Sequence, residues 1–166
     1  LEEPFGEEVS RLTPTTEYGA AKSALFRVFG PLCGKLGLSG SWGRPYFLYG
    51  PDENPRRLVA DVILSLLEGR EALCTHGRQR RDFLHVDDVA DAMVRLMWSE
   101  YEGPLNIGSG TALPLSAVIE EAGRQIGRPE LIRLGAREAR PDDPDLVEAD
   151  TTLMRTGLGW TPRYSL

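Results

Sequence analysis

The stretch YGAAK at residues 18–22 opens an apolar, helix-like segment, and the interpretation of the whole chain starts from it. Tyr18 and Lys22 are four residues apart, so on a helix they share one face and the ammonium lies beside the phenol. A cation close to a phenol favours its ionised form, which lets a tyrosine give or take a proton near neutral pH. The same spacing also suits a surface tyrosine and lysine on an ordinary helix, so the rest of the chain has to decide between the two.

The composition is that of a globular protein of one-domain length. The chain has 166 residues, of which 41% are hydrophobic and 27% charged, and its net charge is -6. An acidic protein is a poor match for nucleic acid or an anionic membrane, which attract basic surfaces. No run approaches the roughly 18 apolar residues of a membrane span, and the N-terminus shows no signal-peptide pattern. We therefore expect a cytoplasmic protein with no nucleic-acid partner and no membrane partner.

The cysteines and histidines point to no metal site. Cys33 and Cys74 are isolated and lack CxxC spacing, so we expect free or buried thiols in a reducing compartment rather than a disulfide. With His76 and His85 they form a possible ligand set on paper, but the spacings match no zinc template. We therefore expect no bound metal ion.

Strands and helices alternate along the chain, and this alternation predicts an α/β fold. Helices are expected from Tyr18 to about Gly34 or Gly37, over 55–67, after an N-cap at Asp87 or Asp88, over 116–126, and after an N-cap at Asp150. Strands are expected over 42–49, 83–86 and 105–108, with short ones within 72–79 and 131–134. Pro45 lacks a backbone donor, which favours an edge or bulged strand over 42–49. Residues 1–14 are acidic and polar, so a loop is expected there.

The helix expected over 116–126 is amphipathic, and for three other expected helices the residues of the apolar face can be named from their helical spacing. The helix that begins at Tyr18 is expected to bury Ala21, Leu25, Val28, Phe29 and Leu32. The helix over 55–67 is expected to bury Leu58, Val59, Val62, Ile63 and Leu66. The helix after Asp88 is expected to bury Val89, Met93, Leu96 and Met97.

Five further motifs follow the Tyr18–Lys22 pair in a fixed order. They are YGP at 49–51, RDFLHVDD at 81–88, NIGSG at 106–110, RPDD at 140–143 and LGW at 158–160. With Pro14 four residues before Tyr18, this order and spacing resembles the C-terminal half of an extended short-chain dehydrogenase/reductase. The subgroup that it resembles most is the NAD-dependent epimerase/dehydratase family, which acts on nucleotide-diphosphate sugars. The resemblance runs from about Pro14 to Pro162.

The resemblance implies the C-terminal part of a Rossmann-type fold, comprising the Tyr–Lys helix, the strand after it and a small α/β substrate-binding domain. Residues 1–51 would be a remnant of the cofactor-binding domain. Residues 52–166 would be mainly substrate-binding, with segments near 81–98 returning to the cofactor-binding domain. No glycine-rich strand–turn–helix unit for a dinucleotide pyrophosphate precedes Tyr18 in this sequence. The glycine triplet at 34, 37 and 40 follows a helix instead of a strand, so we interpret it as a loop.

The resemblance also implies roles for single residues. Tyr18 would be the general acid/base, and Lys22 would activate it and hold the nicotinamide ribose. Tyr49 would lie near the nicotinamide end of the cleft. Arg81 and Arg140 would hold the diphosphate of the sugar nucleotide, because a guanidinium presents a fork of donors that suits phosphate oxygens.

Structural alternatives remain open for both arginines. Arg81 could instead form a salt bridge with Asp82, Asp87 or Asp88, and Arg140 with Asp142 or Asp143. His85 and Trp160 are expected to be structural, the latter as a packing anchor of the C-terminal segment. Phe47 departs from the family, whose members often carry Asn there, so a substrate hydrogen bond from that amide would be lost.

Two functions are consistent with these observations. The first is a portion of an NAD(P)-dependent nucleotide-diphosphate-sugar epimerase, dehydratase or 4-ketoreductase, with NAD or NADP as cofactor and tyrosine as general acid/base. The alternative is a non-catalytic sugar-nucleotide-binding or assembly module, a truncated relative of that family. An isolated half would expose apolar surface on the Tyr18 helix and the Trp42 strand. We therefore expect a homodimer or pairing with a missing N-terminal half, and no turnover from these 166 residues alone.

Overall fold

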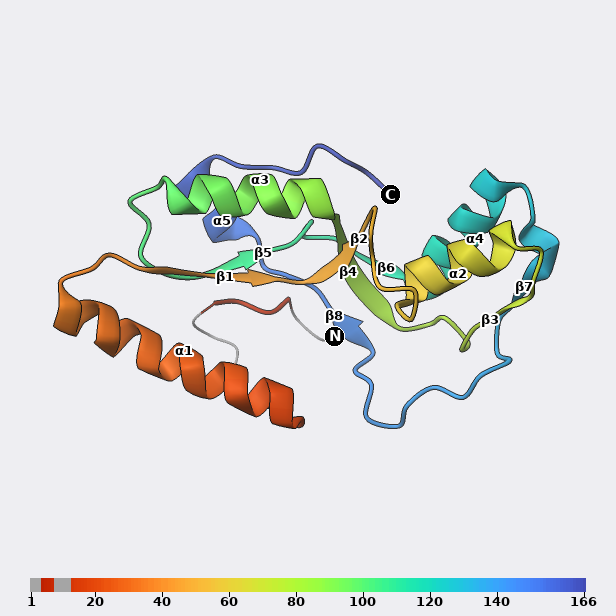
Figure 1. Ribbon diagram of the computed structural model, residues 1–166, viewed down its shortest axis with the longest axis horizontal. Helices are drawn as coiled ribbons and strands as arrows, with labels where there is room; N and C mark the ends of the chain where they lie inside the picture. The colour runs from red at the N-terminus through yellow and green to blue at the C-terminus, as the bar shows by residue number, and fades with distance from the viewer. Residues whose placement is uncertain (1–3, 8–12) are drawn as a thin grey trace.

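Two groups of helices and strands lie side by side along the long axis of the computed structural model, which describes residues 4–7 and 13–166 (Figure 1). The left-hand group in this view contains α1 (Glu17–Leu36), β1 (Ser41–Pro45), α3 (Val86–Met97), β5 (Gly103–Ile107) and α5 (Thr152–Leu158). The right-hand group contains α2 (Leu58–Leu67), β3 (Ala72–Leu73), α4 (Leu115–Ile126), the 3₁₀ turn Pro129–Leu131 and β7 (Ile132–Arg133). Most of the acidic loop expected over 1–14 falls outside the described residues.

Strand β4 (Arg80–His85) joins the two groups. It pairs in parallel with β2 (Phe47–Tyr49) and β8 (Leu146–Val147), and antiparallel with β6 (Ala112–Pro114). The left-hand group adds the parallel pair β1–β5, and the right-hand group the parallel pair β3–β7. The predicted α/β class, with parallel strands and helices in alternation, is confirmed.

Pro45 divides the strand that was expected over 42–49. β1 ends at Pro45, which lies opposite Ile107 of β5, and the Tyr46 amide donates to the Ile107 carbonyl at 3.0 Å. After this point the chain changes partner, because β2 pairs with β4 instead of β5. In the described part of the chain β1 has β5 as its only strand neighbour, which confirms the prediction of an edge strand.

α2 and α4 closely match the helices expected over 55–67 and 116–126. The burial predicted for the apolar side chains of α1 is wrong. Thr16 caps α1 by accepting from the Gly19 amide at 3.1 Å, and Gly37 ends it with a φ of 65°. Yet Leu25, Val28 and Leu32 are 54%, 58% and 48% exposed. The two-stranded β1–β5 sheet covers only the narrow strip of α1 that packs on Trp42. The apolar exposure expected for an isolated half is therefore confirmed for the Tyr18 helix, whereas Trp42 and its neighbours in β1 are only partly exposed.

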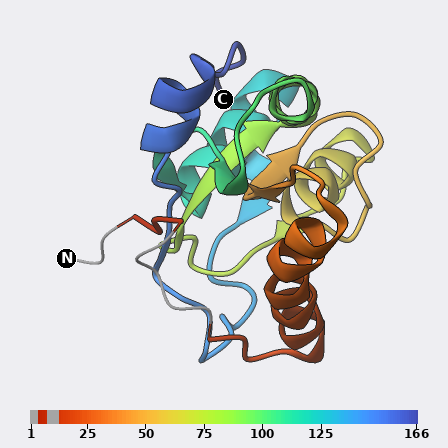
Figure 2. The same ribbon diagram turned by 90° about the vertical axis from the view of Figure 1, so that its left-hand side faces the viewer.

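α1 and α3 lie on opposite faces of β1 (Figure 2). On one face Phe26 and Phe29 of α1 pack against Trp42, with ring centroids 5.6 and 5.4 Å apart. On the other face Gly43 leaves room for Met93 of α3, because a Cβ there would lie 2.5 Å from the methionine sulfur. This sandwich holds the middle of α1 against the sheet.

The buried apolar side chains form two clusters, one in each group of elements. The left-hand cluster consists of Leu84, Val89, Ala92, Leu96, Leu105, Ile107, Met154 and Trp160. The right-hand cluster consists of Val62, Leu66, Ala72, Cys74 and Ile119. The role of Trp160 as a packing anchor is confirmed, since it is 2% exposed. Met93 and Met97, which were expected to be buried, are 42% and 66% exposed because they face the uncovered edge of β1. The division at residues 51 and 52 stays a prediction.

Candidate functional site

Tyr18 lies in the first turn of α1 and is 74% exposed. The Lys22 ammonium is 5.8 Å from the centroid of the Tyr18 ring, which confirms that the two side chains share one face of the helix. Gly19 lets the preceding segment approach this turn, since a Cβ there would lie 3.2 Å from the Pro14 Cβ. The structure thus presents a phenol and an ammonium together, open to a ligand.

Arg81, the second residue of β4, is 3% exposed. Its Nη2 donates to Asp143 Oδ1 at 2.7 Å, its Nη1 donates to the Arg80 carbonyl at 2.8 Å, and its guanidinium lies 5.5 Å from the Phe47 ring centroid. The alternative of a salt bridge to Asp82, Asp87 or Asp88 is wrong. Adjacent residues on a strand point to opposite faces, which rules out Asp82, and the partner comes from 62 residues further along the chain.

The RPDD motif at 140–143 forms a turn between β7 and β8. The Asp143 amide donates to the Arg140 carbonyl at 3.2 Å, and the Asp143 carboxylate reaches Arg81. Arg140 is exposed, and among the described residues its side chain forms no ion pair with Asp142 or Asp143. The structure therefore brings the RDF and RPDD motifs together through Asp143, a contact that sequence reasoning missed.

Asp82 organises the NIGSG loop. Its carboxylate is fully buried and accepts from the Ser109 amide at 2.7 Å, the Ser109 hydroxyl at 2.6 Å and the Gly110 amide at 2.9 Å. The Ala149 amide adds a fourth hydrogen bond at 3.2 Å. A Cβ at Gly108 would lie 2.7 Å from Asp82 Oδ2, so only glycine fits at this position. Gly108 thus makes room for the Asp82 carboxylate, and Gly110 donates a backbone hydrogen bond to it.

Tyr49, at the end of β2, lies in an aromatic group with His85 and Tyr164. Its ring meets His85 edge-on at 5.2 Å, and His85 stacks on Tyr164 at 4.2 Å. The Tyr49 hydroxyl donates to the Ser165 carbonyl at 3.4 Å. Burial, and then the charge of Asp88, raise the pKa of Tyr49, which keeps its hydroxyl protonated. The C-terminal segment, residues 160–166, thus covers the carboxyl ends of β2 and β4.

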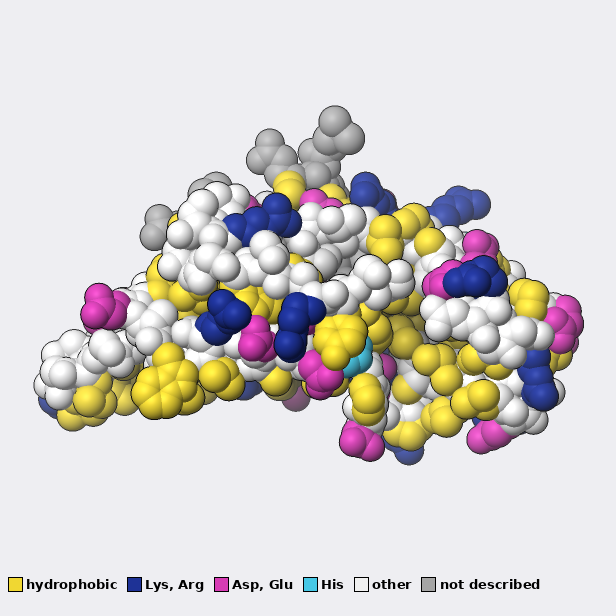
Figure 3. Space-filling model, turned by 90° about the horizontal axis from the view of Figure 1, so that it is seen from above, with side chains coloured by type: hydrophobic (Ala, Val, Ile, Leu, Met, Phe, Trp, Pro, Cys, Tyr) yellow, Lys and Arg dark blue, Asp and Glu magenta, His cyan; other side chains and the backbone are white. Residues whose placement is uncertain are grey.

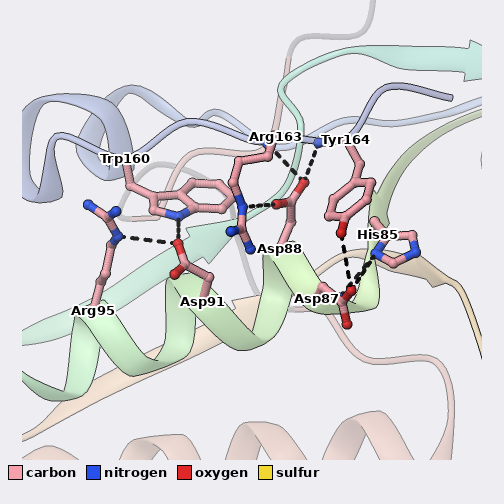
Figure 4. A network of polar contacts seen from close by, with 8 residues as sticks. All are labelled: His85, Asp87, Asp88, Asp91, Arg95, Trp160, Arg163 and Tyr164. Carbon is pink, nitrogen blue, oxygen red and sulfur yellow. Dashed lines mark hydrogen bonds and ion pairs between the residues drawn. The ribbon is translucent and has the colours of Figure 1, made fainter.

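Acidic residues of α3 hold this segment in place (Figure 4). Asp88 Oδ2 accepts from the backbone amides of Arg163 and Tyr164 at 3.0 and 2.9 Å, and Asp91 accepts from the Trp160 indole at 2.6 Å. The N-cap predicted at Asp87 or Asp88 is wrong, because His85 Nδ1 accepts from the Asp87 amide at 3.2 Å. The histidine cap leaves Asp88 available for the C-terminal segment.

Residues 4–7 and 13–166 lack two features, a helix able to cross a membrane and a cluster of metal ligands. None of the helices in these ranges is long and apolar enough to cross a membrane. Within the same ranges, no three His, Cys, Asp or Glu side chains are grouped as metal ligands would be.

The chain is similar to a known protein family in sequence and to a solved structure in fold. Residues 1–108 match the model of the NAD dependent epimerase/dehydratase family. The chain is 34% identical over 127 residues to UDP-glucuronic acid decarboxylase 5 of Arabidopsis thaliana, covering 74% of this chain and 36% of that protein. It is 32% identical over 172 aligned positions to GDP-L-fucose synthase 1 of Arabidopsis thaliana, covering 93% of this chain and 51% of that one. The solved structure of MoeE5 in complex with UDP-glucose and NAD matches 99% of this chain and 56% of its own, with 29% identity and a TM-score of 0.86.

The chain therefore belongs to the NAD-dependent epimerase/dehydratase family, and its resemblance to the extended short-chain dehydrogenase/reductases is confirmed. It spans about a third to about half the length of these relatives.

Proposed function

We propose that this chain is a portion of an NAD(P)-dependent enzyme that acts on a nucleotide-diphosphate sugar, with Tyr18 as general acid/base. The observation that carries the proposal is the exposed Tyr18 phenol with the Lys22 ammonium 5.8 Å from its ring. The relatives support it, because their names specify sugar nucleotides and one solved structure contains both UDP-glucose and NAD. Epimerisation, dehydration and 4-keto reduction all need such a proton donor and acceptor.

Tyr18 and Lys22 suit the reactive end of a nicotinamide cofactor, because both side chains are exposed on one face at the start of α1. When bound, NAD or NADP supplies the hydride acceptor or donor. As a phenolate, Tyr18 would take the proton of the sugar hydroxyl, and as a phenol it would give that proton back. The Lys22 ammonium stabilises the phenolate and donates to the ribose, and Tyr49 is proposed to border the nicotinamide end.

Arg81 and Arg140 are the proposed diphosphate ligands. The supporting observation is the RPDD turn, which places the Arg140 backbone one hydrogen bond away from the residue that contacts Arg81. Two guanidinium groups bracketing one pyrophosphate would supply charge-assisted hydrogen bonds at both ends.

Calorimetric titration with UDP-glucose tests this assignment on Arg81→Ala, Arg140→Ala and the control Arg78→Ala. Arg78 is exposed, as Arg140 is, but lies outside the two motifs. Charge-assisted hydrogen bonds are worth about 1.5–3 kcal/mol each, so each motif variant should bind about tenfold or more weakly than the control. Full affinity in both motif variants, with lower thermal stability, would show that the two arginines are structural.

The uncovered edge of β1 favours an assembled protein, either a homodimer or a pairing with an N-terminal half. A groove of about 530 Å³ runs along this edge, lined by Phe29 of α1, Gly43 of β1, and Met93 and Met97 of α3. In the view from above, hydrophobic side chains gather along the lower edge of the left-hand part of the molecule (Figure 3). Exposed apolar side chains gathered on one face are typical of an interaction site. The same observation favours the alternative function, an assembly module without turnover.

Sedimentation of the 166-residue chain tests the assembly. A Leu32→Glu change on α1 should lower the mass of any self-associated species, whereas Leu134→Glu, also at an exposed leucine but between β7 and β8, should not. A monomer that becomes a one-to-one complex on addition of the N-terminal half of a relative would select that pairing. A monomer in both experiments would refute the assembly proposal.

A further inference from the structure

Arg81 has almost no surface to offer a dissolved anion. Both of its terminal nitrogens already donate, one to Asp143 and one to the Arg80 carbonyl, and the Phe47 ring lies over the guanidinium. The backbone on either side is also occupied, since Arg81 pairs with Leu113 of β6 and Val147 of β8. A guanidinium has five N–H groups, so three remain free of these two bonds, but only 4% of the side chain is exposed. A phosphate can therefore reach Arg81 only if one of these neighbours is displaced.

Asp143 is the contact that the protein can give up at least cost. Its side chain is 35% exposed, whereas that of Arg81 is 4% exposed. It lies in the segment 134–145, which contains no helix or strand, so displacing the turn leaves both apolar clusters intact. The Arg80 carbonyl, by contrast, belongs to the central strand β4 and cannot move without disturbing three strand pairings.

The negative charges of Asp143 and of a diphosphate also favour release of Asp143. A diphosphate at Arg81 would place two or more negative charges next to the Asp143 carboxylate, and like charges at such short range repel each other. Asp143 and the diphosphate are thus alternative counterions for one buried guanidinium. Release of Asp143 also frees the turn that carries Arg140, whose guanidinium is exposed.

We propose that Asp143 is a built-in competitor of the ligand: it holds Arg81 in the unliganded protein, and the diphosphate replaces it there. This inference rests on the proposed sugar-nucleotide function and adds a residue that sets the affinity of the site. The Asp143 carboxylate lowers affinity for any diphosphate, because every binding event has to break the ion pair first.

Asp143→Asn tests the proposal, with Asp142→Asn as the matched control. Both changes remove one negative charge from the same turn, but only Asp143 contacts Arg81. Calorimetric titration with inorganic pyrophosphate and with UDP-glucose should show about tenfold tighter binding to Asp143→Asn than to wild type or the control. The unliganded Asp143→Asn protein should unfold at a lower temperature than the control. Both differences should disappear in an Arg81→Ala background.

The outcomes separate this inference from the function on which it rests. Equal affinity of the two Asn variants would show that Asp143 does not compete, with the sugar-nucleotide site itself left intact. Weaker binding by Asp143→Asn would mean that Asp143 positions Arg81 for the ligand, which also overturns the proposal. Binding of neither probe to any variant would refute the proposed function and, with it, the competition. In wild type, pyrophosphate should also speed hydrogen exchange at the Asp143 amide, whereas slower exchange would contradict release of the turn.

Discussion

Asp88→Ala would remove the carboxylate that fastens the C-terminal segment to α3 (Figure 4). Asp88 is fully buried, and its Oδ2 accepts from the backbone amides of Arg163 and Tyr164 at 3.0 and 2.9 Å. Its Oδ1 is 3.4 Å from Arg163 Nε, a side chain that is 62% exposed. The variant leaves three donors without their acceptor while every apolar core residue stays in place.

The two backbone bonds dominate the expected loss of stability. A hydrogen bond to a charged group is worth about 1.5–3 kcal/mol, whereas an ion pair with an exposed partner is worth about 0–1 kcal/mol. Water can reach the freed amides because Arg163 and Tyr164 are exposed, so the lower value applies to each. The free energy of unfolding should therefore fall by about 3 kcal/mol. At about 2–4 °C per kcal/mol for a chain of this size, the melting temperature should fall by about 6–12 °C.

Urea and thermal unfolding followed by circular dichroism measure this loss, with Asp87→Ala as the control. Asp87 is the neighbouring aspartate, but its side chain is 60% exposed and its contacts with Tyr164 and His85 are 3.4 and 3.7 Å long. The control should stay within about 0.5 kcal/mol of wild type. An Asp88→Ala protein as stable as the control would refute the claim that these hydrogen bonds hold the segment.

Three further predictions concern catalysis, pH and packing. In the complete enzyme, Tyr18→Phe should lower the turnover number by about 10²–10⁴ with little change in sugar-nucleotide affinity; an unchanged turnover number would make Tyr18 a surface aromatic. Burial, and then the charges of Asp82 and Glu7, raise the pKa of Tyr46 above its ordinary value of 10.0. The stability that the protonated Tyr46 phenol provides is therefore complete below about pH 10 and lost as the pH rises further. In urea unfolding at increasing alkaline pH, the free energy of unfolding of Tyr46→Phe should fall less steeply than that of wild type. Leu84→Ala, at a position 2% exposed, should cost about 2–5 kcal/mol in urea unfolding, whereas Leu32→Ala, at a position 48% exposed, should cost under about 1 kcal/mol; equal losses would contradict the burial described for α1.

Local and periodic signals in the sequence were enough to establish the family and the fold class. The spacing of Tyr18 and Lys22 needs only the rise of one helix to become a contact, and the structure shows that contact. The helix expected over 116–126 is present as Leu115–Ile126 and ends at Gly127, because glycine readily takes the left-handed conformation found there. The order of the five motifs carried the family assignment without any knowledge of their contacts.

Contacts between distant segments could not be read from the sequence. The partner of Arg81 is Asp143, which no local rule connects to β4, since the pairing of β8 beside β4 brings the two together. Likewise, Asp88 follows a pattern typical of a helix cap, but the approach of the C-terminal segment turns it into that segment's anchor. In both cases local rules assigned a charged side chain a role within its own segment, and the fold instead bonds it to residues far along the chain.

By itself, the sequence determined which faces are apolar, because that property belongs to each segment alone. Only the tertiary structure decided which of these faces are covered, because burial depends on what packs against them. The apolar faces of α2 and α4 meet each other and close the right-hand cluster. The apolar face of α1 meets a sheet of two strands, so Leu25, Val28 and Leu32 remain in solvent. An apolar face is buried only when a partner surface of matching size is present.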